Sequence, residues 1–145
     1  MSQTAAYPQT RYRPSPVVDL TSKEERERLS PAAIRTFFNI MARWSVRDED
    51  ARALLGGVSN GPFYEMKKDS ERTLDTDRLT RISYLIGVFK ALNVLYSEKL
   101  ADKWIQLPND NPIFGGRTPL AYMMKGGQPA MQTVRRLLDA RRGGM

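Results

Sequence analysis

The 145 residues include no Cys and no His, and these two absences limit the chemistry that the chain can perform. Without a thiolate or an imidazole there is no disulfide, no zinc site of the Cys/His kind and no Ser-His-Asp triad. A small enzyme would have to use Asp, Glu, Lys, Tyr or Ser, and the sequence places no pair of carboxylates together in an apolar stretch. We therefore expect a non-enzymatic protein with no catalytic residues, no cofactor and no metal site.

The net charge of +7 is concentrated at the C-terminal end of the chain. Residues 111–145 carry a net charge of +5, whereas residues 31–75 carry seven basic and seven acidic side chains. A basic protein suggests nucleic acid as a partner, but a basic tail also favours docking on an acidic or phosphate-rich surface, and the usual meaning of such a run is a solvated helix face. The tail arginines in question are Arg135, Arg136, Arg141 and Arg142.

A second candidate site is the run from Gly115 to Leu120. Gly115 and Gly116 permit a close backbone approach or a positive φ. Thr118 and Pro119 then predict the start of a helix, whose free amides and the neighbouring Arg117 could hold an anion. The alternative is a plain helix-entry turn with an exposed arginine. The run lacks the Gly-Lys-Ser/Thr ending of a phosphate-binding loop.

Residues 48–68 have the proportions of a helix-turn-helix, with Gly56 and Gly57 at the turn. In such a motif the second helix enters the major groove of DNA. The side chains predicted to face DNA are Ser59, Asn60, Tyr64, Lys67 and Lys68. Gly61 and Pro62 in the first turn and the balanced charge of the segment count against DNA binding, and glycine-linked helix pairs also occur in bundles without this function.

These residues require an all-α scaffold, because no alternating strand pattern is present. Residues 1–20, with three prolines and few large aliphatic residues, predict a flexible arm. Ser22 and Glu25 predict a capping box on a short helix, and Ser30-Pro31 predicts the start of the next one. Further helices are expected over 48–55, 59–68, 76–96, from 97, from 118 to a stop at Gly126-Gly127, and from Pro129 to before Gly143.

The helix expected over residues 76–96 has two apolar stripes on its circumference. A helix of this kind must be covered on both sides. In so small a chain the second cover is predicted to be another subunit, which gives a homodimer. The longest uncharged stretch of this helix, residues 82–89, is too short to span a bilayer, and the N-terminus lacks the apolar core of a signal peptide. We therefore expect a cytoplasmic protein without a membrane segment.

Four segments together resemble antitoxins of the Xre/MbcA/ParS type, and the resemblance covers about residues 30–145. They are Leu54-Leu55-Gly56-Gly57-Val58-Ser59, residues 81–92 (RISYLIGVFKAL), residues 111–120 (NPIFGGRTPL) and residues 134–139 (VRRLLD). The resemblance implies an antitoxin of a type II toxin–antitoxin system whose partner is a RES-domain toxin that consumes NAD. It also implies repression of its own operon through operator DNA, and a dimer.

The resemblance divides the chain into a helix-turn-helix region, residues 21–75, and a helical dimerisation and toxin-binding domain, residues 76–145. Residues 59–68 match the recognition helix. The toxin-binding residues that it implies are Gly115, Gly116, Arg117, Thr118, Pro119, Arg135, Arg136, Arg141 and Arg142. The competing interpretations are a plain dimeric helix-turn-helix transcription regulator and a small enzyme.

Overall fold

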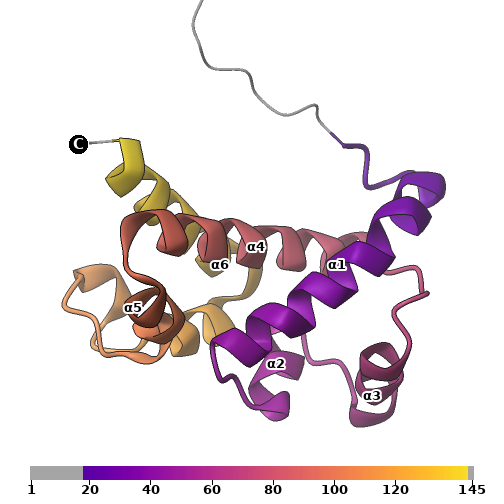
Figure 1. Ribbon diagram of the computed structural model, residues 1–145, viewed down its shortest axis with the longest axis horizontal. Helices are drawn as coiled ribbons and strands as arrows, with labels where there is room; N and C mark the ends of the chain where they lie inside the picture. Colours follow the sequence, from indigo (N-terminus) through magenta and orange to yellow (C-terminus); the bar gives the residue numbers. More distant parts are fainter. Residues whose placement is uncertain (1–17, 144–145) are drawn as a thin grey trace, which may run out of the picture.

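The computed structural model describes residues 18–143, and within this range it contains helices and no strand (Figure 1). This confirms the predicted all-α fold. The elements are α1 (Lys23–Arg43), α2 (Asp48–Leu54), α3 (Asn60–Lys68), α4 (Thr76–Leu95), α5 (Glu98–Lys103), the 3-10 helices η1 (Trp104–Gln106) and η2 (Pro112–Phe114), and α6 (Pro119–Gly143). No helix in this range is long and apolar enough to cross a membrane.

The predicted arm, residues 1–20, lies outside the described residues except for its last three positions. Of these, Leu20 packs against the hydrophobic core. Its carbonyl accepts hydrogen bonds from the guanidinium of Arg26 and the hydroxyl of Thr76, each at 2.9 Å. The packed part of the chain therefore includes Leu20, which the sequence had assigned to the arm.

The prediction that a new helix starts at Ser30-Pro31 is wrong, because α1 runs without a break from Lys23 to Arg43. Its cap is Ser22, whose side chain accepts a hydrogen bond from the amide of Glu25. Ser30 is fully buried inside the helix. Its hydroxyl donates to the carbonyl of Arg26 at 2.6 Å and accepts from the amide of Leu74 at 2.8 Å. The serine thus joins α1 to the segment before α4.

Pro31 is tolerated inside α1 because of its position on the helix. Proline has no N–H, so it removes the hydrogen bond to the carbonyl four residues earlier. That residue is Glu27, which is exposed, so water can reach this part of the helix. The sequence Ser-Pro occurs both at the start of helices and in their interior. The structure places this pair in the interior, where the hydroxyl of Ser30 accepts a hydrogen bond from the distant amide of Leu74.

Helix α4 lies at the centre of the fold, and both of its apolar stripes are covered within one chain. It packs against α1 on one side and α6 on another (Figure 1). Ile82, Leu85 and Val88 are almost completely buried. The two stripes therefore do not require a second subunit, because α6 supplies the cover that we expected from a partner. The homodimer itself stays a prediction.

One group of polar contacts ties α2, α4 and α6 together. The Nε atom of Arg81 on α4 pairs with the carboxylate of Asp77 at 3.0 Å, and its Nη1 atom donates to the carbonyl of Leu54 at 3.4 Å. Asp77 also accepts a hydrogen bond from the side chain of Gln128 at 2.5 Å. Beside Gln128, α6 is interrupted by Gly127, whose φ of 64° and ψ of −145° suit only glycine. The predicted stop at Gly126-Gly127 is therefore a break between two helical halves of α6.

Candidate functional site

Most residues of the segment 111–120 build the loop between η1 and α6. The side chain of Asn111 accepts from the amide of Ile113 at 3.1 Å and so begins η2. Phe114 is completely buried. Its ring meets the rings of Trp104 and Tyr122 edge-on, with centroids 6.2 and 5.3 Å apart. Phe114 thereby anchors the loop to η1 and to the first half of α6.

The predicted binding residues 115–119 differ in how much of them a partner can reach. Gly115 and Gly116 are exposed, and their φ angles of 57° and 83° explain why glycine is needed at both positions. Arg117 is exposed as well. Thr118 is half-buried and caps α6 by accepting from the amide of Ala121 at 3.1 Å, and Pro119 is buried at the start of that helix. Thr118 and Pro119 therefore shape the loop more than they present a contact surface.

Sequence reasoning missed Ile113, whose side chain is 40% exposed in the middle of this loop. The sequence could not identify Ile113 as exposed, because Ile113 and Phe114 are neighbouring apolar residues and either of them could have been the one in the core. Within residues 111–120, Ile113 and Arg117 have large side chains that are exposed and make no cap or core contact. Together with the smaller side chain of Pro112, they are what this segment exposes to a partner.

The four arginines predicted in the last helix also differ in their surroundings. Arg135 and Arg142 both pair with Asp139 at 3.7 Å. Arg141 donates to the hydroxyl of Tyr96 at 3.2 Å and so holds the last turn of α6 near the end of α4. Arg136 is exposed and, within residues 18–143, has no carboxylate within ion-pair distance. Arg136 is therefore the one of the four whose charge is fully available at the surface.

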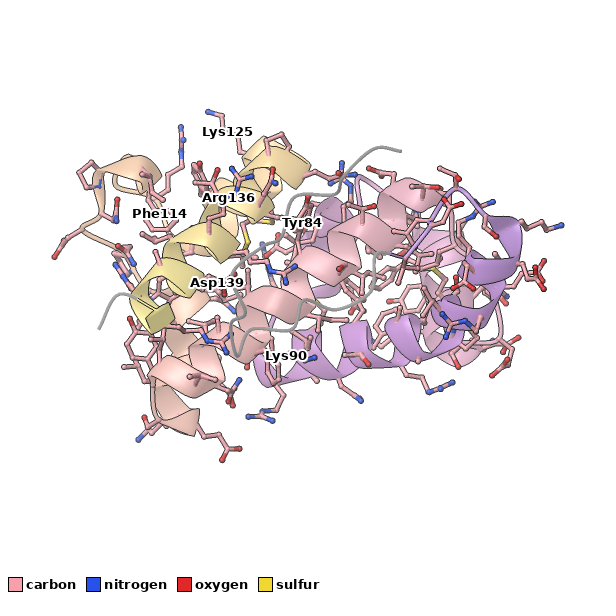
Figure 2. The ribbon with its side chains drawn as sticks, turned by 90° about the horizontal axis from the view of Figure 1, so that it is seen from above. Tyr84, Lys90, Phe114, Lys125, Arg136 and Asp139 are labelled. Atoms are coloured by element: carbon pink, nitrogen blue, oxygen red, sulfur yellow. The ribbon has the colours of Figure 1, made fainter. Side chains whose placement is uncertain are left out.

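Cations without an ion pair are concentrated in the second half of the described chain. Between residues 90 and 143 they are Lys90, Lys99, Lys103, Arg117, Lys125, Arg136 and Arg141, whereas residues 18–89 contribute only Arg26, Arg52 and Lys68. Figure 2 shows Lys125 and Arg136 on α6 at the same end of the molecule as Phe114. The described residues contain no group of three acidic side chains that could hold a metal ion. The surface formed by Arg117 of the loop and by Lys125 and Arg136 of α6 therefore carries unpaired cations and suits an acidic partner.

The segment predicted as a helix-turn-helix consists of α2, a turn with positive φ at Gly56 and Gly57, and α3. Ser59, Asn60 and Lys68 are exposed, and Tyr64 is 45% exposed. Lys67 pairs with Asp48 at 3.2 Å and lies 6.0 Å from the ring centre of Phe38.

Acidic residues occupy the first turn of α2, and this limits the positive charge beside α3. They are Asp48, Glu49 and Asp50. Arg47, just before them, pairs with Asp50 at 3.3 Å, and the hydrogen bond to that carboxylate raises the pKa of Arg47. In this region Arg47 and Lys67 are therefore paired with carboxylates of α2, whereas Arg52 and Lys68 have no ion pair among the described residues.

Comparison with known proteins shows which family the chain resembles in the segment that forms this surface. Residues 90–144 match the antitoxin Xre/MbcA/ParS C-terminal toxin-binding domain. The chain is also 38% identical over 115 residues to the uncharacterized protein y4oB of Sinorhizobium fredii (strain NBRC 101917 / NGR234), a match that covers 79% of this chain and 87% of that protein. No solved structure shows a significant match. The chain therefore belongs to the Xre/MbcA/ParS antitoxins and is the antitoxin of a toxin–antitoxin system.

Proposed function

We propose that this antitoxin neutralises a RES-domain toxin by covering the site at which the toxin binds NAD. The observation that carries the proposal is the concentration of unpaired cations in the segment that matches the toxin-binding domain. The proposal requires an acidic rim around that site, because such a rim attracts the arginine and lysine side chains of the antitoxin. In this proposal Ile113 and Arg117 of the loop and Arg136 of α6 contact the toxin, and the antitoxin itself performs no chemistry.

The direct test uses the product of the adjacent reading frame. If that protein is a RES-domain toxin, the full-length antitoxin should form a complex with it and stop its consumption of NAD at a fixed stoichiometry. A neighbouring protein of another kind, or a RES-domain toxin that stays active with excess antitoxin, would contradict the proposal. The first of these results would favour the plain helix-turn-helix regulator.

The C-terminal arginines provide a sharper prediction. A chain that ends at Asp139 loses Arg141 and Arg142, and we expect it to inhibit the toxin about tenfold less well, because each exposed charge contributes up to about 1 kcal/mol. The matched control ends at Arg142 and removes only residues 143–145. Both chains are measured by the concentration that halves NAD consumption. Equal inhibition by the two chains would show that Arg141 and Arg142 do not contribute to toxin binding.

We further propose that residues 21–75 bind operator DNA through α3 and repress the antitoxin's own operon, while residues 76–145 bind the toxin. The α2–turn–α3 arrangement supports this proposal. Lys68 has no ion pair within the described residues, whereas Lys67 is engaged by Asp48. Lys68 is therefore the better placed of the two for a phosphate contact.

Replacing lysines of α3 should change how DNA binding depends on salt. Each phosphate contact contributes about −0.9 to the slope of log K against log salt concentration. We expect Lys68→Ala to reduce the slope by about one and Lys67→Ala to reduce it less. Lys99→Ala, an exposed lysine on α5, is the control. If the Lys67→Ala, Lys68→Ala double variant binds the upstream promoter fragment as tightly as the parent, α3 is not the recognition helix.

We also propose that the protein forms a homodimer through the helix that the sequence places at residues 76–96. Because α1 and α6 cover both stripes of α4, the part of that helix still open to another chain is the face that includes Ser83, Ile86 and Lys90. Light scattering on the full-length chain measures whether it forms a dimer.

A further inference from the structure

A pocket of about 360 Å³ lies where the end of α1 meets α5 and η1. Polar side chains join these parts, and the carboxylate of Asp102 pairs with the Nε atom of Arg43 at 3.0 Å. The side-chain amide of Gln106 donates to the carbonyl of Trp44 at 2.7 Å and to that of Ser45 at 3.0 Å. All five residues line the pocket, and none of the lining residues belongs to the α4 face proposed for the homodimer.

The pocket carries positive charge that the described residues do not compensate. Lys99 and Lys103 line it and are exposed, and neither has a carboxylate within ion-pair distance in residues 18–143. Arg43, by contrast, pairs with both Glu98 and Asp102. Because Lys99 and Lys103 are four residues apart on α5, their side chains leave the same face of the helix about 6 Å apart. One carboxylate can therefore contact both ammonium groups.

An exposed apolar side chain lies beside these lysines. Leu107, four residues after Lys103, also lines the pocket and is 42% exposed. Six large hydrophobic residues of the described chain are at least 39% exposed, and four of them fall between residues 94 and 113. These four are Val94, Leu100, Leu107 and Ile113. This segment of the chain therefore offers a partner apolar contacts as well as charge.

Operator DNA is another anionic partner that could reach the two lysines. Its phosphates contact cations, but a sugar-phosphate backbone offers little apolar surface to cover Leu107, and protein–DNA interfaces are more polar than protein–protein interfaces. Burying Leu107 against an apolar side chain would instead contribute favourably to binding. The combination of lysines and leucine in one pocket therefore favours a protein as its occupant.

We propose that this pocket binds an acidic segment of the toxin. A carboxylate of that segment lies between Lys99 and Lys103, and a neighbouring apolar side chain packs against Leu107. Charge complementarity selects the segment, because the side chains that line the pocket include three cations and one carboxylate. The proposal rests on the proposed function only in taking the toxin as the partner. It extends the toxin contact to Arg43 and Trp44, which lie outside the segment that matches the toxin-binding domain.

The absence of Cys allows a single thiol to be placed in the pocket of the full-length protein. Leu107→Cys places it there, and the matched control is Tyr64→Cys on α3, where the native side chain is 45% exposed. Each variant is alkylated with iodoacetamide, alone and with saturating toxin, and mass spectrometry follows the modified antitoxin. The toxin should slow alkylation of Leu107→Cys at least about tenfold, because the reagent needs access to the thiolate. Alkylation of Tyr64→Cys should not change.

The protection experiment separates this proposal from the proposed function. If the complex forms but Leu107→Cys reacts as fast as in the free antitoxin, the pocket proposal is wrong while toxin binding stands. If no complex forms with the toxin, both fail. Protection of Leu107→Cys by the upstream promoter fragment and not by the toxin would overturn the proposal and assign the pocket to DNA.

The two lysines are tested by affinity. Lys99→Ala combined with Lys103→Ala should weaken toxin binding about tenfold, since it removes two exposed charges from the contact. Lys67→Ala combined with Lys68→Ala changes the net charge by the same amount on α3 and should leave the affinity for the toxin unchanged. The difference between the two double variants should become smaller as salt is raised. Equal affinities of the two at low salt would show that the pocket does not bind a carboxylate of the toxin.

Discussion

Phe114→Ala should lower the free energy of unfolding by about 3–5 kcal/mol, which is the range for removing a large buried aromatic side chain. The ring of Phe114 is fully buried between Trp104 and Tyr122, and it joins the loop to η1 and α6. A whole domain of this size has a stability of only about 5–15 kcal/mol. The variant should therefore unfold at a much lower urea concentration and should lose toxin binding as the loop detaches.

The measurement is urea unfolding followed by circular dichroism, with Ile113→Ala as the matched control. Ile113 precedes Phe114 in the same 3-10 helix but is 40% exposed, so its truncation should change stability by about 0.5 kcal/mol or less. In toxin binding the two variants report different properties: Ile113→Ala tests contact, and Phe114→Ala tests the loop scaffold. A loss of less than 1 kcal/mol in Phe114→Ala would show that Phe114 does not anchor the loop.

Arg117→Glu combined with Arg136→Glu should weaken the affinity for the toxin at least about 100-fold, or about 2.7 kcal/mol. Each substitution turns an attraction to an acidic surface into a repulsion. Both residues are exposed and have no ion pair in residues 18–143, so the fold should tolerate the change. The effect should decrease as salt is raised, because exposed charges are screened.

Lys68→Glu is the control for this charge reversal. Lys68 is also an exposed cation without an ion pair in the described residues, but it lies on α3, outside the segment that matches the toxin-binding domain. Calorimetric titration of each variant with the toxin compares the three affinities directly. If Lys68→Glu weakens binding as much as the double variant, overall charge determines the affinity and the proposed loop surface does not.

Local signals predicted most of the helices, and distant contacts account for the errors. Gly56 and Gly57 marked a turn and Gly127 a helix break correctly, because tolerance of a positive φ is a property of glycine itself. Ser30 was misassigned because its function in the fold depends on the amide of Leu74, forty-four residues away. The second cover of α4 was assigned to another subunit because periodicity shows that a face is buried but does not show what buries it.

The candidate site was predicted only in outline for a similar reason. Composition locates the excess of arginine in the last quarter of the chain, but it does not show which of these charges are paired. Asp139 engages Arg135 and Arg142 and leaves Arg136 free, a difference set by helical spacing and rotamers. Composition likewise does not show that Pro119 is buried and Arg117 exposed, although both belong to one continuous motif.

The central position of α4 affects how this antitoxin can change its partner during evolution. The segment that matches the toxin-binding domain begins at Lys90, in the interior of a helix that starts at Thr76. The contacts of Arg81 join that helix to the last residue of α2 and, through Asp77, to α6. A recombination junction at residue 90 would therefore divide a shared helix and disrupt the packing on both sides. Under the proposed toxin contacts, new partner specificity is more accessible through single substitutions at exposed positions such as Ile113 and Arg136 than through the exchange of a whole segment.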